Sequence, residues 1–539
     1  MDRRGFLRAA AIGVSAAASI GPACRRPPGG ASPETQVFTD AFALEETTIS
    51  DLRDGMSSGR LTARSIVEAY LARIDSMDRQ GPALRSLIEV NPDVLTITEQ
   101  LDRERRQGRT RGPLHGIPVL LKDNIDTHDR MTTTAGSLAL SGSVPARDSF
   151  VAQRLRAAGA VLLGKANMSE WANIRSSRST SGWSARGGQC RNPYVLDRNP
   201  CGSSSGSAVA VSANLAAVAI GTETDGSIVC PASANGIVGI KPTVGLVSRA
   251  GIIPISHSQD TAGPMARTVR DAALLLGAMA GVDSGDTATR TREGGTHDYT
   301  TFLDAGGLRG ARIGVARDFF GFDERVDRVL QTALDEMSAQ GAVLIDPLEL
   351  RLPREAGLLE LNVLLYELKA NLNAYLEALD SSVPVRSLED VIRFNEENRE
   401  TEMPYFGQDL FLEAEKKGPL SDEVYLQSLD AIRTTAREEG IDAVMEQHRL
   451  DAIVAPTGGP AWKTDLVNGD QVAGGSARPA AIAGYPNITV PAGHILGLPI
   501  GLSFFGRAWS EPVLLRIAYA FEQATMQRRP PRFLPELTA

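Results

Sequence analysis

Several features are scarce in this 539-residue sequence, and each absence argues against a class of protein. The formal net charge is −9 and no long block of like charge is present, so nucleic acid is not an expected partner. The four cysteines include no C-x-x-C pair, and the six histidines do not cluster with them, which argues against a zinc site. We therefore expect neither a metal nor a cofactor. A monomer and a homodimer are both compatible with the sequence.

The N-terminus lacks an apolar run long enough to span a membrane, but it resembles an export signal. In MDRRGFLRAAAIGVSAAASIGPAC, Arg3 and Arg4 precede a short alanine-rich run, which is typical of a twin-arginine signal. We expect residues 1–26 to be this signal and residues 27–40, rich in Pro and Gly, to be a flexible tether. The expected location is periplasmic or extracellular. A cytosolic protein with a basic N-terminus is the alternative.

The cysteines bear on the same question. Cys24 is a candidate lipid-attachment site, which would make the protein a membrane-anchored lipoprotein, although the preceding Gly-Pro-Ala is a poor match for that modification. If Cys24 is removed or lipidated, Cys190, Cys201 and Cys230 remain and cannot all pair. Twin-arginine substrates fold before export in a reducing compartment, so we expect these thiols to be free.

Residues 41–539 are expected to form one domain, because no further linker, repeat or low-complexity block interrupts them. The apolar runs at 117–121 and 161–163 predict buried strands, and residues 149–159 between them predict a helix. A further helix is predicted at 61–78, with Thr62 as its N-cap. This alternation indicates an α/β fold with a large mixed, mostly parallel sheet covered by helices.

Residues 354–445 have a different pattern. Leucines step by three and four from Leu358 to Leu379, which predicts a long amphipathic helix in a helix-rich insertion. The strand-helix alternation then returns in DAIVAPT, PNITVPAG, PIGLSFFGR and PVLLRIAYAFEQA.

Hydrolysis by a serine requires a neutral base and donors for the oxyanion. His115 and His257 lie in Gly/Pro-rich segments, and a structural role is the better interpretation of each. Lys122 follows the apolar run IPVLL, and burial lowers the pKa of a lysine and favours its neutral amine. The alternative is a lysine paired with Asp123 or Asp126.

Two serine-bearing segments accompany this lysine. PCGSSSGSA holds Ser203 to Ser205 between two glycines and runs into AVAVSANLAAVAI, which predicts an apolar helix. GTETDGSIVCPAS places Ser227 in a turn after Gly226. Each segment taken alone is also compatible with an ordinary turn.

Together with GIPVLLKDNID, these segments resemble the amidase signature family, over about residues 45–530. The family patterns P-G-G-S-S-G-G-S and G-T-D-T-G-G-S-I align with PCGSSSGS at 200–207 and GTETDGSI at 221–228. This chain departs from them at Cys201, Ser205, Glu223 and Asp225 without losing a catalytic group.

The resemblance implies a mechanism residue by residue. Ser227 is the expected nucleophile of an acyl-enzyme, Ser203 the bridging serine held by a cis peptide, and Lys122 the terminal base. The implied oxyanion hole consists of the backbone N–H groups of Thr224, Asp225, Gly226 and Ser227. Ser204 and Asp225 are candidate substrate-binding residues, and Ser204, Ser205 and Ser207 are expected to shape the turn and cap the helix.

Within the family, the motif regions look most like those of bacterial peptide amidases, which implies removal of a C-terminal peptide amide as ammonia. Asp225 favours a neutral carboxamide over an anionic substrate. Trp171, Trp183 and Tyr194 are candidates for the acyl pocket or, equally, for the core. The alternatives are an exported amidase of small aliphatic, aryl or fatty amides, a tRNA-amidotransferase subunit, a phosphate-binding module and a non-catalytic binding protein.

Overall fold

The computed structural model of the protein describes residues 42–291, 298–350, 352–353 and 355–537, all within one compact unit. The predicted signal (1–26) and tether (27–40) lie outside the described residues. The strands are β1 (Leu87–Val90), β2 (Pro118–Lys122), β3 (Val161–Ala166), β4 (Trp183–Ser184), β5 (Gly188–Gln189), β6 (Val218–Glu223), β7 (Val238–Lys241), β8 (Thr261–Ala266), β9 (Arg312–Ala316), β10 (Val343–Leu348), β11 (Ala452–Pro456), β12 (Asn487–Ile495) and β13 (Leu498–Phe505). The α-helices are α1 (Ile49–Ser57), α2 (Ala63–Arg73), α3 (Val94–Arg106), α4 (Phe150–Ala157), α5 (Ser205–Ser212), α6 (Val229–Ala234), α7 (Val269–Met279), α8 (Glu324–Ala339), α9 (Ala356–Glu377), α10 (Leu388–Glu397), α11 (Arg399–Glu402), α12 (Asp409–Glu415), α13 (Glu423–Ala436), α14 (Asp442–His448), α15 (Ala477–Ala483) and α16 (Glu511–Thr525).

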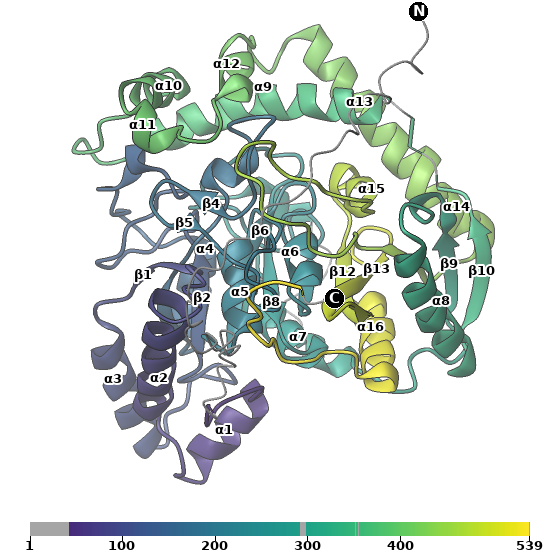
Figure 1. Cartoon of the computed structure of the whole chain (residues 1–539), viewed down its shortest axis with the longest axis horizontal. Helices are drawn as coiled ribbons and strands as arrows, with labels where there is room; N and C mark the ends of the chain where they lie inside the picture. Colours follow the sequence, from purple (N-terminus) through teal and green to yellow (C-terminus); the bar gives the residue numbers. More distant parts are fainter. Residues whose placement is uncertain (1–41, 292–297, 351, 354, 538–539) are drawn as a thin grey trace, which may run out of the picture. The chain divides into compact units, whose positions relative to one another are not determined.

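The core is an eleven-stranded mixed sheet with the order β1-β3-β2-β6-β8-β7-β12-β13-β11-β9-β10 (Figure 1). This confirms the α/β fold, but the expectation of mostly parallel strands is wrong. Six of the ten neighbouring pairs in the described sheet are antiparallel. Parallel pairing is confined to β2 with β3 and β6, and to β9 with β10 and β11. β12 and β13 are joined by two residues, and so short a connection permits only antiparallel pairing.

The predicted elements around the N-terminal half of the sheet are confirmed. β2 and β3 are fully buried parallel neighbours, and α4 connects them. Thr62 caps α2, because its side chain accepts a hydrogen bond from the Ser65 backbone N–H at 2.9 Å. A π-helical turn, Ile74–Arg79, extends α2 to the predicted end of the helical pattern.

The helix predicted over AVAVSANLAAVAI is shorter than expected. α5 ends at Ser212, and Asn214 has the left-handed φ of 59° that turns the chain out of the helix. Residues 218–223 form β6, which pairs with β2 on one side and β8 on the other. The segment is apolar throughout, and a fully buried strand and a fully buried helix share that composition.

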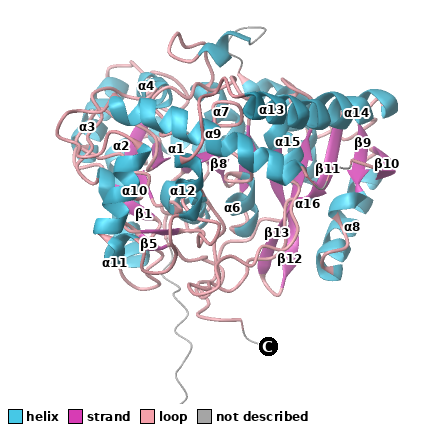
Figure 2. Ribbon diagram, turned by 90° about the horizontal axis from the view of Figure 1, so that it is seen from above, coloured by secondary structure: helices cyan, strands magenta, loops and turns pink. Residues whose placement is uncertain are grey.

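The helix-rich insertion is present as predicted. α9 is a 22-residue helix that contacts α12 and α13, and Figures 1 and 2 show these helices along one side of the sheet. Leu365, Leu368 and Leu372 of α9 share a buried cluster with Trp171 and Ile253. The insertion therefore packs onto the loops that follow the central strands.

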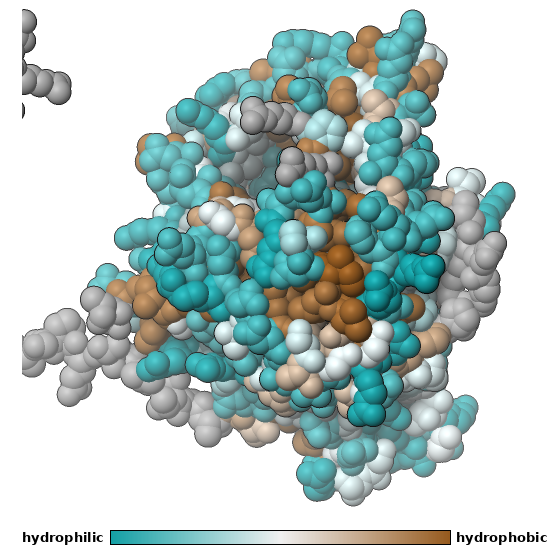
Figure 3. All heavy atoms as spheres, turned by 90° about the vertical axis from the view of Figure 1, so that its right-hand side faces the viewer, coloured by the Kyte–Doolittle hydropathy of each residue, from teal (hydrophilic) through white to brown (hydrophobic). Residues whose placement is uncertain are grey.

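β10 is the last strand of the sheet on the side that Figure 3 presents. That face carries an apolar area among hydrophilic side chains, and Val343 of β10 is 45% exposed. No helix in the described part of the chain has both the length and the apolar character needed to cross a lipid bilayer.

Candidate active site

The candidate base lies where two parallel strands end together. Lys122 is the last residue of β2, and its neighbour β6 brings Thr222 to the same edge of the sheet. Lys122 Nζ lies 2.8 Å from Ser203 Oγ, 2.8 Å from Thr222 Oγ1 and 3.1 Å from the Thr222 carbonyl oxygen. The amine is therefore held between the candidate bridging serine and the end of β6.

Burial makes this amine a base near neutral pH. Lys122 has no exposed surface, and burial lowers its pKa to about 7, against the opposing charges of Asp260 and Glu223. The alternative pairing with Asp123 or Asp126 is not found. Lys165, in the neighbouring strand β3, is the lysine whose positive charge lowers the pKa of those two carboxyls, against the larger effect of their burial.

Ser203 is fully buried and is preceded by a cis peptide bond between Gly202 and Ser203. Its carbonyl oxygen accepts a hydrogen bond from the Ser169 backbone N–H at 3.0 Å. Its hydroxyl is the acceptor of Lys122 Nζ. The segment thus presents the Ser203 side chain to Lys122.

Ser227 occupies the turn between β6 and α6. Gly226 before it has φ of 76°, a left-handed conformation that glycine adopts without steric cost. Ser227 is 9% exposed, whereas Ser203 and Lys122 are completely buried, so it is the most accessible of the three. The Ser204 N–H donates to the Ser227 carbonyl at 3.2 Å, and no hydrogen bond joins the Ser203 and Ser227 hydroxyls in the described structure.

The candidate oxyanion donors are unengaged. The backbone N–H groups of residues 224–227 have no acceptor within the described residues. The next two N–H groups, of Ile228 and Val229, donate to Glu223 Oε2 at 2.7 and 3.0 Å. The Thr224 hydroxyl donates to Asp260 Oδ1 at 2.6 Å. The turn is thus fixed on both sides, and four consecutive donors are left for a ligand.

The neighbouring serines hold the loop itself. Ser204 is fully buried, and its hydroxyl donates to the Thr222 carbonyl and accepts from the Thr222 N–H. These bonds engage the Ser204 hydroxyl at the end of β6, and its role in substrate binding stays a prediction. Ser205 and Ser207 donate to the carbonyls of Cys201 and Ile220, so they shape the turn, and no side-chain cap is found at the start of α5.

His115 has structural surroundings, whereas the half-exposed His257 lines a different cavity together with Thr222 and Thr224. His115 is buried, with Nε2 2.9 Å from the Leu101 carbonyl oxygen. His257 Nε2 lies 3.4 Å from Glu367 Oε1. Neither forms a hydrogen bond with Ser203 or Ser227 in the described part of the chain.

A cavity of about 360 Å³ opens beside the Ser227 turn. Gly202, Asp225, Gly226 and Arg478 are among its lining residues. Arg478 Nε lies 3.5 Å from Asp225 Oδ2 and 2.9 Å from Glu360 Oε2. Burial raises the pKa of Asp225, and burial together with the Asp225 charge raises the pKa of Glu360 to about 8. The predicted residue Asp225 therefore faces the cavity as part of a charged cluster.

The three aromatic candidates for the acyl pocket lie elsewhere. Trp171, Trp183 and Tyr194 are buried, and none lines this cavity. Trp171 packs against Phe411, and Trp183 against Phe406. Trp171 and Tyr194 belong to buried apolar clusters, which supports the core interpretation for these two, whereas Trp183 lines a different cavity together with Tyr405.

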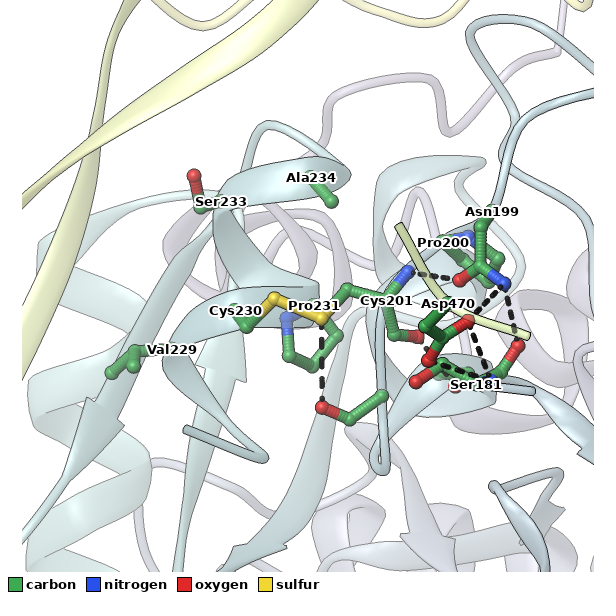
Figure 4. Close-up of a disulfide and its surroundings, with 12 residues drawn as sticks. Ser181, Asn199, Pro200, Cys201, Val229, Cys230, Pro231, Ser233, Ala234 and Asp470 are labelled. Atoms are coloured by element: carbon green, nitrogen blue, oxygen red, sulfur yellow. Dashed lines mark hydrogen bonds between the residues drawn. A yellow bond between two sulfur atoms is a disulfide. The ribbon is translucent and has the colours of Figure 1, made fainter. Parts of the chain in front are cut away.

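The expectation of free thiols is wrong for two cysteines. Cys201 and Cys230 form a disulfide with a Cα–Cα distance of 6.0 Å, shown in Figure 4, and Cys190 is a buried free thiol. The partners are 29 residues apart in sequence. They meet because β6 and the following turn return α6 to residues 199–204, the loop that carries Ser203 and is called the Ser203 loop below.

Sequence reasoning missed two residues that complete the surroundings of Lys122. Thr222 supplies two of its acceptors, and Asn124 donates through Nδ2 to Thr222 Oγ1 at 3.0 Å. Both lie in segments already singled out, within two residues of Lys122 or Thr224. Their polar side chains beside buried strand ends were the available indication.

Comparisons with known proteins agree with this architecture. The Amidase family matches residues 65–515. The crystal structure of the peptide amidase PAM with the competitive inhibitor chymostatin is 54% identical, has a TM-score of 0.89, and covers 91% of this chain and 100% of that one. The native peptide amidase from Stenotrophomonas maltophilia is 53% identical, with a TM-score of 0.87 and coverage of 92% and 100%. A "probable amidase" of Arabidopsis thaliana is 46% identical over 514 residues, covering 92% of this chain and 93% of that protein. The chain therefore belongs to the amidase signature family and is an amide-hydrolysing enzyme.

Proposed function

We propose that the protein removes the C-terminal amide of peptides and releases ammonia, through an acyl-enzyme on Ser227. The observation that carries the catalytic assignment is the 2.8 Å contact between Ser203 Oγ and the fully buried amine of Lys122, whose pKa is lowered to about 7. An amine that is half neutral near pH 7 can accept a proton without a histidine.

In the proposed reaction, Ser227 Oγ attacks the amide carbonyl carbon while its proton passes to Ser203, and the Ser203 proton passes to Lys122. The N–H groups of residues 224–227 stabilise the oxyanion. The C–N bond then breaks, and the protons return along the same path to the leaving nitrogen, which departs as ammonia. Water attacks the ester by the same relay and releases the peptide acid. The relay requires the Ser203 and Ser227 hydroxyls to approach when substrate binds.

The peptide specificity rests on the cavity and on the relatives described as peptide amidases. Asp225 places a carboxylate at the mouth of the oxyanion site, where Arg478 partly balances its charge. A peptide that ends in a free acid would bring a second carboxylate close to Asp225, whereas a carboxamide would not. We therefore assign Asp225 the discrimination between amide and acid.

The experiment is a panel of peptide amides, free peptides, glutamine, and small aliphatic, aryl and fatty amides. Ammonia or amine release is measured for the wild type, Ser227→Ala and the exposed control Ser76→Ala. We expect Ser227-dependent release to be fastest from peptide amides. Release only from aryl or fatty amides would show that these amides, and not peptide amides, are the substrate class. If no compound gives Ser227-dependent release, the catalytic assignment is refuted.

Asp225→Gly tests the specificity assignment separately. It is expected to retain amide hydrolysis and to bind peptides that end in a free acid more tightly as inhibitors. An unchanged ratio of KM for the amide to Ki for the acid would contradict the role of Asp225.

We further propose that the enzyme is exported by a twin-arginine signal and works in the periplasm or outside the cell, with a lipid anchor on Cys24 as the alternative form. The Cys201–Cys230 disulfide supports this location, because such bonds persist in oxidising compartments. Cell fractionation of wild type and Arg3→Lys/Arg4→Lys tests the proposal. Equal distribution of both chains between the fractions would refute it.

A further inference from the structure

The disulfide links the two segments that carry the candidate catalytic serines. Cys201 lies two residues before Ser203, and Cys230 lies three residues after Ser227, in the first turn of α6. Figure 4 shows the bond between the Ser203 loop and this helix. The covalent connection therefore spans the same gap that the proposed proton relay must cross.

Few other interactions span that gap. The direct hydrogen bonds between residues 199–205 and 224–235 in the described structure are from the Ser204 N–H to the Ser227 carbonyl, at 3.2 Å, and from Asn235 Nδ2 to the Pro200 carbonyl, at 2.8 Å. One is long and the other lies at the far end of the loop. The disulfide is the covalent constraint nearest both hydroxyls.

The backbone of Cys201 points to the same role. Its φ of 58° is in the left-handed region, which disfavours a residue with a Cβ. The aligned position in the family pattern is glycine. The Cys201 N–H donates to Asn199 Oδ1 at 2.8 Å, and its carbonyl accepts from Ser205 Oγ at 2.6 Å. A cysteine at this conformation is explained by the bond its side chain makes with Cys230.

The bond is also within reach of a small thiol. Cys201 and Cys230 both line the 360 Å³ cavity, together with Gly202 and Gly226. Cys230 is partly exposed, whereas the free thiol of Cys190 is buried. A reductant that enters the cavity would meet this disulfide before any other cysteine of the described chain.

We propose that the Cys201–Cys230 disulfide is a positioning element of the catalytic centre, which fixes Ser203 relative to Ser227, and that its reduction reversibly lowers turnover. Reduction breaks the Sγ–Sγ bond and adds one electron and one proton to each sulfur. Both electrons and both protons come from a small dithiol, which closes to its own disulfide. This inference rests on the proposed function for its kinetic readout only.

The kinetic test compares the oxidised enzyme with the enzyme reduced by dithiothreitol and then freed of reductant. Thiol counting after unfolding verifies the gain of two thiols, and Cys190→Ser serves as the matched control. We expect kcat to fall at least fivefold on the best amide of the panel, with KM within twofold and full recovery on reoxidation. The pH midpoint of kcat/KM stays unchanged, because burial of Lys122 sets it. An unchanged kcat after verified reduction would overturn the proposal.

Two double variants, which both lack the disulfide, test whether the backbone conformation at residue 201 matters for the position of Ser203. Cys201→Gly/Cys230→Ala relieves the backbone at 201, whereas Cys201→Ala/Cys230→Ala keeps a Cβ in the left-handed conformation without the bond that holds it. We expect the glycine variant to retain several-fold more kcat than the alanine variant. Equal kcat values in the two variants, both at the wild-type level, would contradict the proposed role.

Hydrogen exchange on the same samples gives a readout independent of activity. Reduction is expected to speed exchange in residues 200–205 and 226–231 and to leave α16 unchanged. If exchange in both segments is unaltered, the positioning role is refuted even if no amide is hydrolysed. If exchange rises and no amide is hydrolysed, the proposed function fails and the positioning role stands.

Discussion

Replacing Lys122 by methionine measures the energetic cost of keeping the candidate base neutral. Its pKa is lowered from the ordinary 10.5 to about 7 because the amine is fully buried. A group whose pKa is lower in the folded than in the unfolded state destabilises the fold at every pH where the unfolded form is charged. The shift corresponds to a cost of about 5 kcal/mol well below pH 7, about 4 kcal/mol at pH 7 and about 2 kcal/mol at pH 9.

Methionine removes this cost and also removes the hydrogen bonds of Nζ to Ser203 and Thr222. Each lost bond costs about 1 kcal/mol, and this loss does not change with pH. The pH dependence therefore isolates the contribution of the charge. The free energy of unfolding of Lys122→Met, measured relative to that of the wild type, should fall by about 2 kcal/mol between pH 7 and pH 9. Above pH 10.5 the unfolded lysine is neutral too, so the variant no longer gains stability from removing the amine.

Urea titrations of both proteins at pH 6, 7 and 9 give the free energies of unfolding. Lys416→Met is the control, because that lysine is 68% exposed. The difference in unfolding free energy between this variant and the wild type should change little from pH 6 to pH 9. A difference between Lys122→Met and wild type that is the same at pH 7 and pH 9 would refute the assignment of Lys122 as a neutral buried base.

Three further results are expected. The kcat/KM of the wild type should rise about tenfold from pH 6 to pH 8 with a midpoint near 7, because the Lys122 amine loses its proton over this range. His115→Ala and His257→Ala should show the same pH profile. Loss of activity in a folded histidine variant would contradict the assignment of Lys122 as the base. Thr222→Val removes a hydroxyl 2.8 Å from Lys122 Nζ and should lower kcat about tenfold with little change in KM. If steady-state kinetics show a change in KM alone, Thr222 contacts the substrate instead. Glu223→Ala leaves two N–H groups at the start of α6 without their acceptor and should cost about 2–4 kcal/mol in a denaturation experiment, whereas an unaltered Tm would show that Glu223 does not hold this turn.

The sequence predicted much of the site because its parts are local. An apolar run that ends in a charge placed Lys122 at the end of a buried strand, and the structure puts it there. Glycines beside Ser203 and Ser227 predicted tight turns, and Gly226 has the expected left-handed backbone. The predicted proximity of the lysine and the serine loop came from the family resemblance, and the 2.8 Å contact of Lys122 with Ser203 agrees with it.

The features that the sequence did not predict depend on how distant segments meet. To predict the disulfide, one would need to know the direction in which the chain runs from β6 into α6, and no local sequence pattern encodes that direction. The start of β6 at Val218 was hidden because a uniformly apolar segment has no periodicity to separate strand from helix. Strand direction in the C-terminal half of the sheet likewise depends on connections, such as the short hairpin between β12 and β13, whose paths composition does not reveal.

The left-handed backbone at Cys201 constrains the order in which substitutions can accumulate. In an ancestor with glycine at this position, cysteine at 201 alone would add about 1–2 kcal/mol of strain and an unpaired thiol at the cavity wall. Cysteine at 230 alone would lie on an ordinary helical turn at little cost. The lower-cost route therefore acquires Cys230 first. Reconstructed ancestors along this lineage should include chains with Cys230 and glycine at 201, and few with the reverse combination.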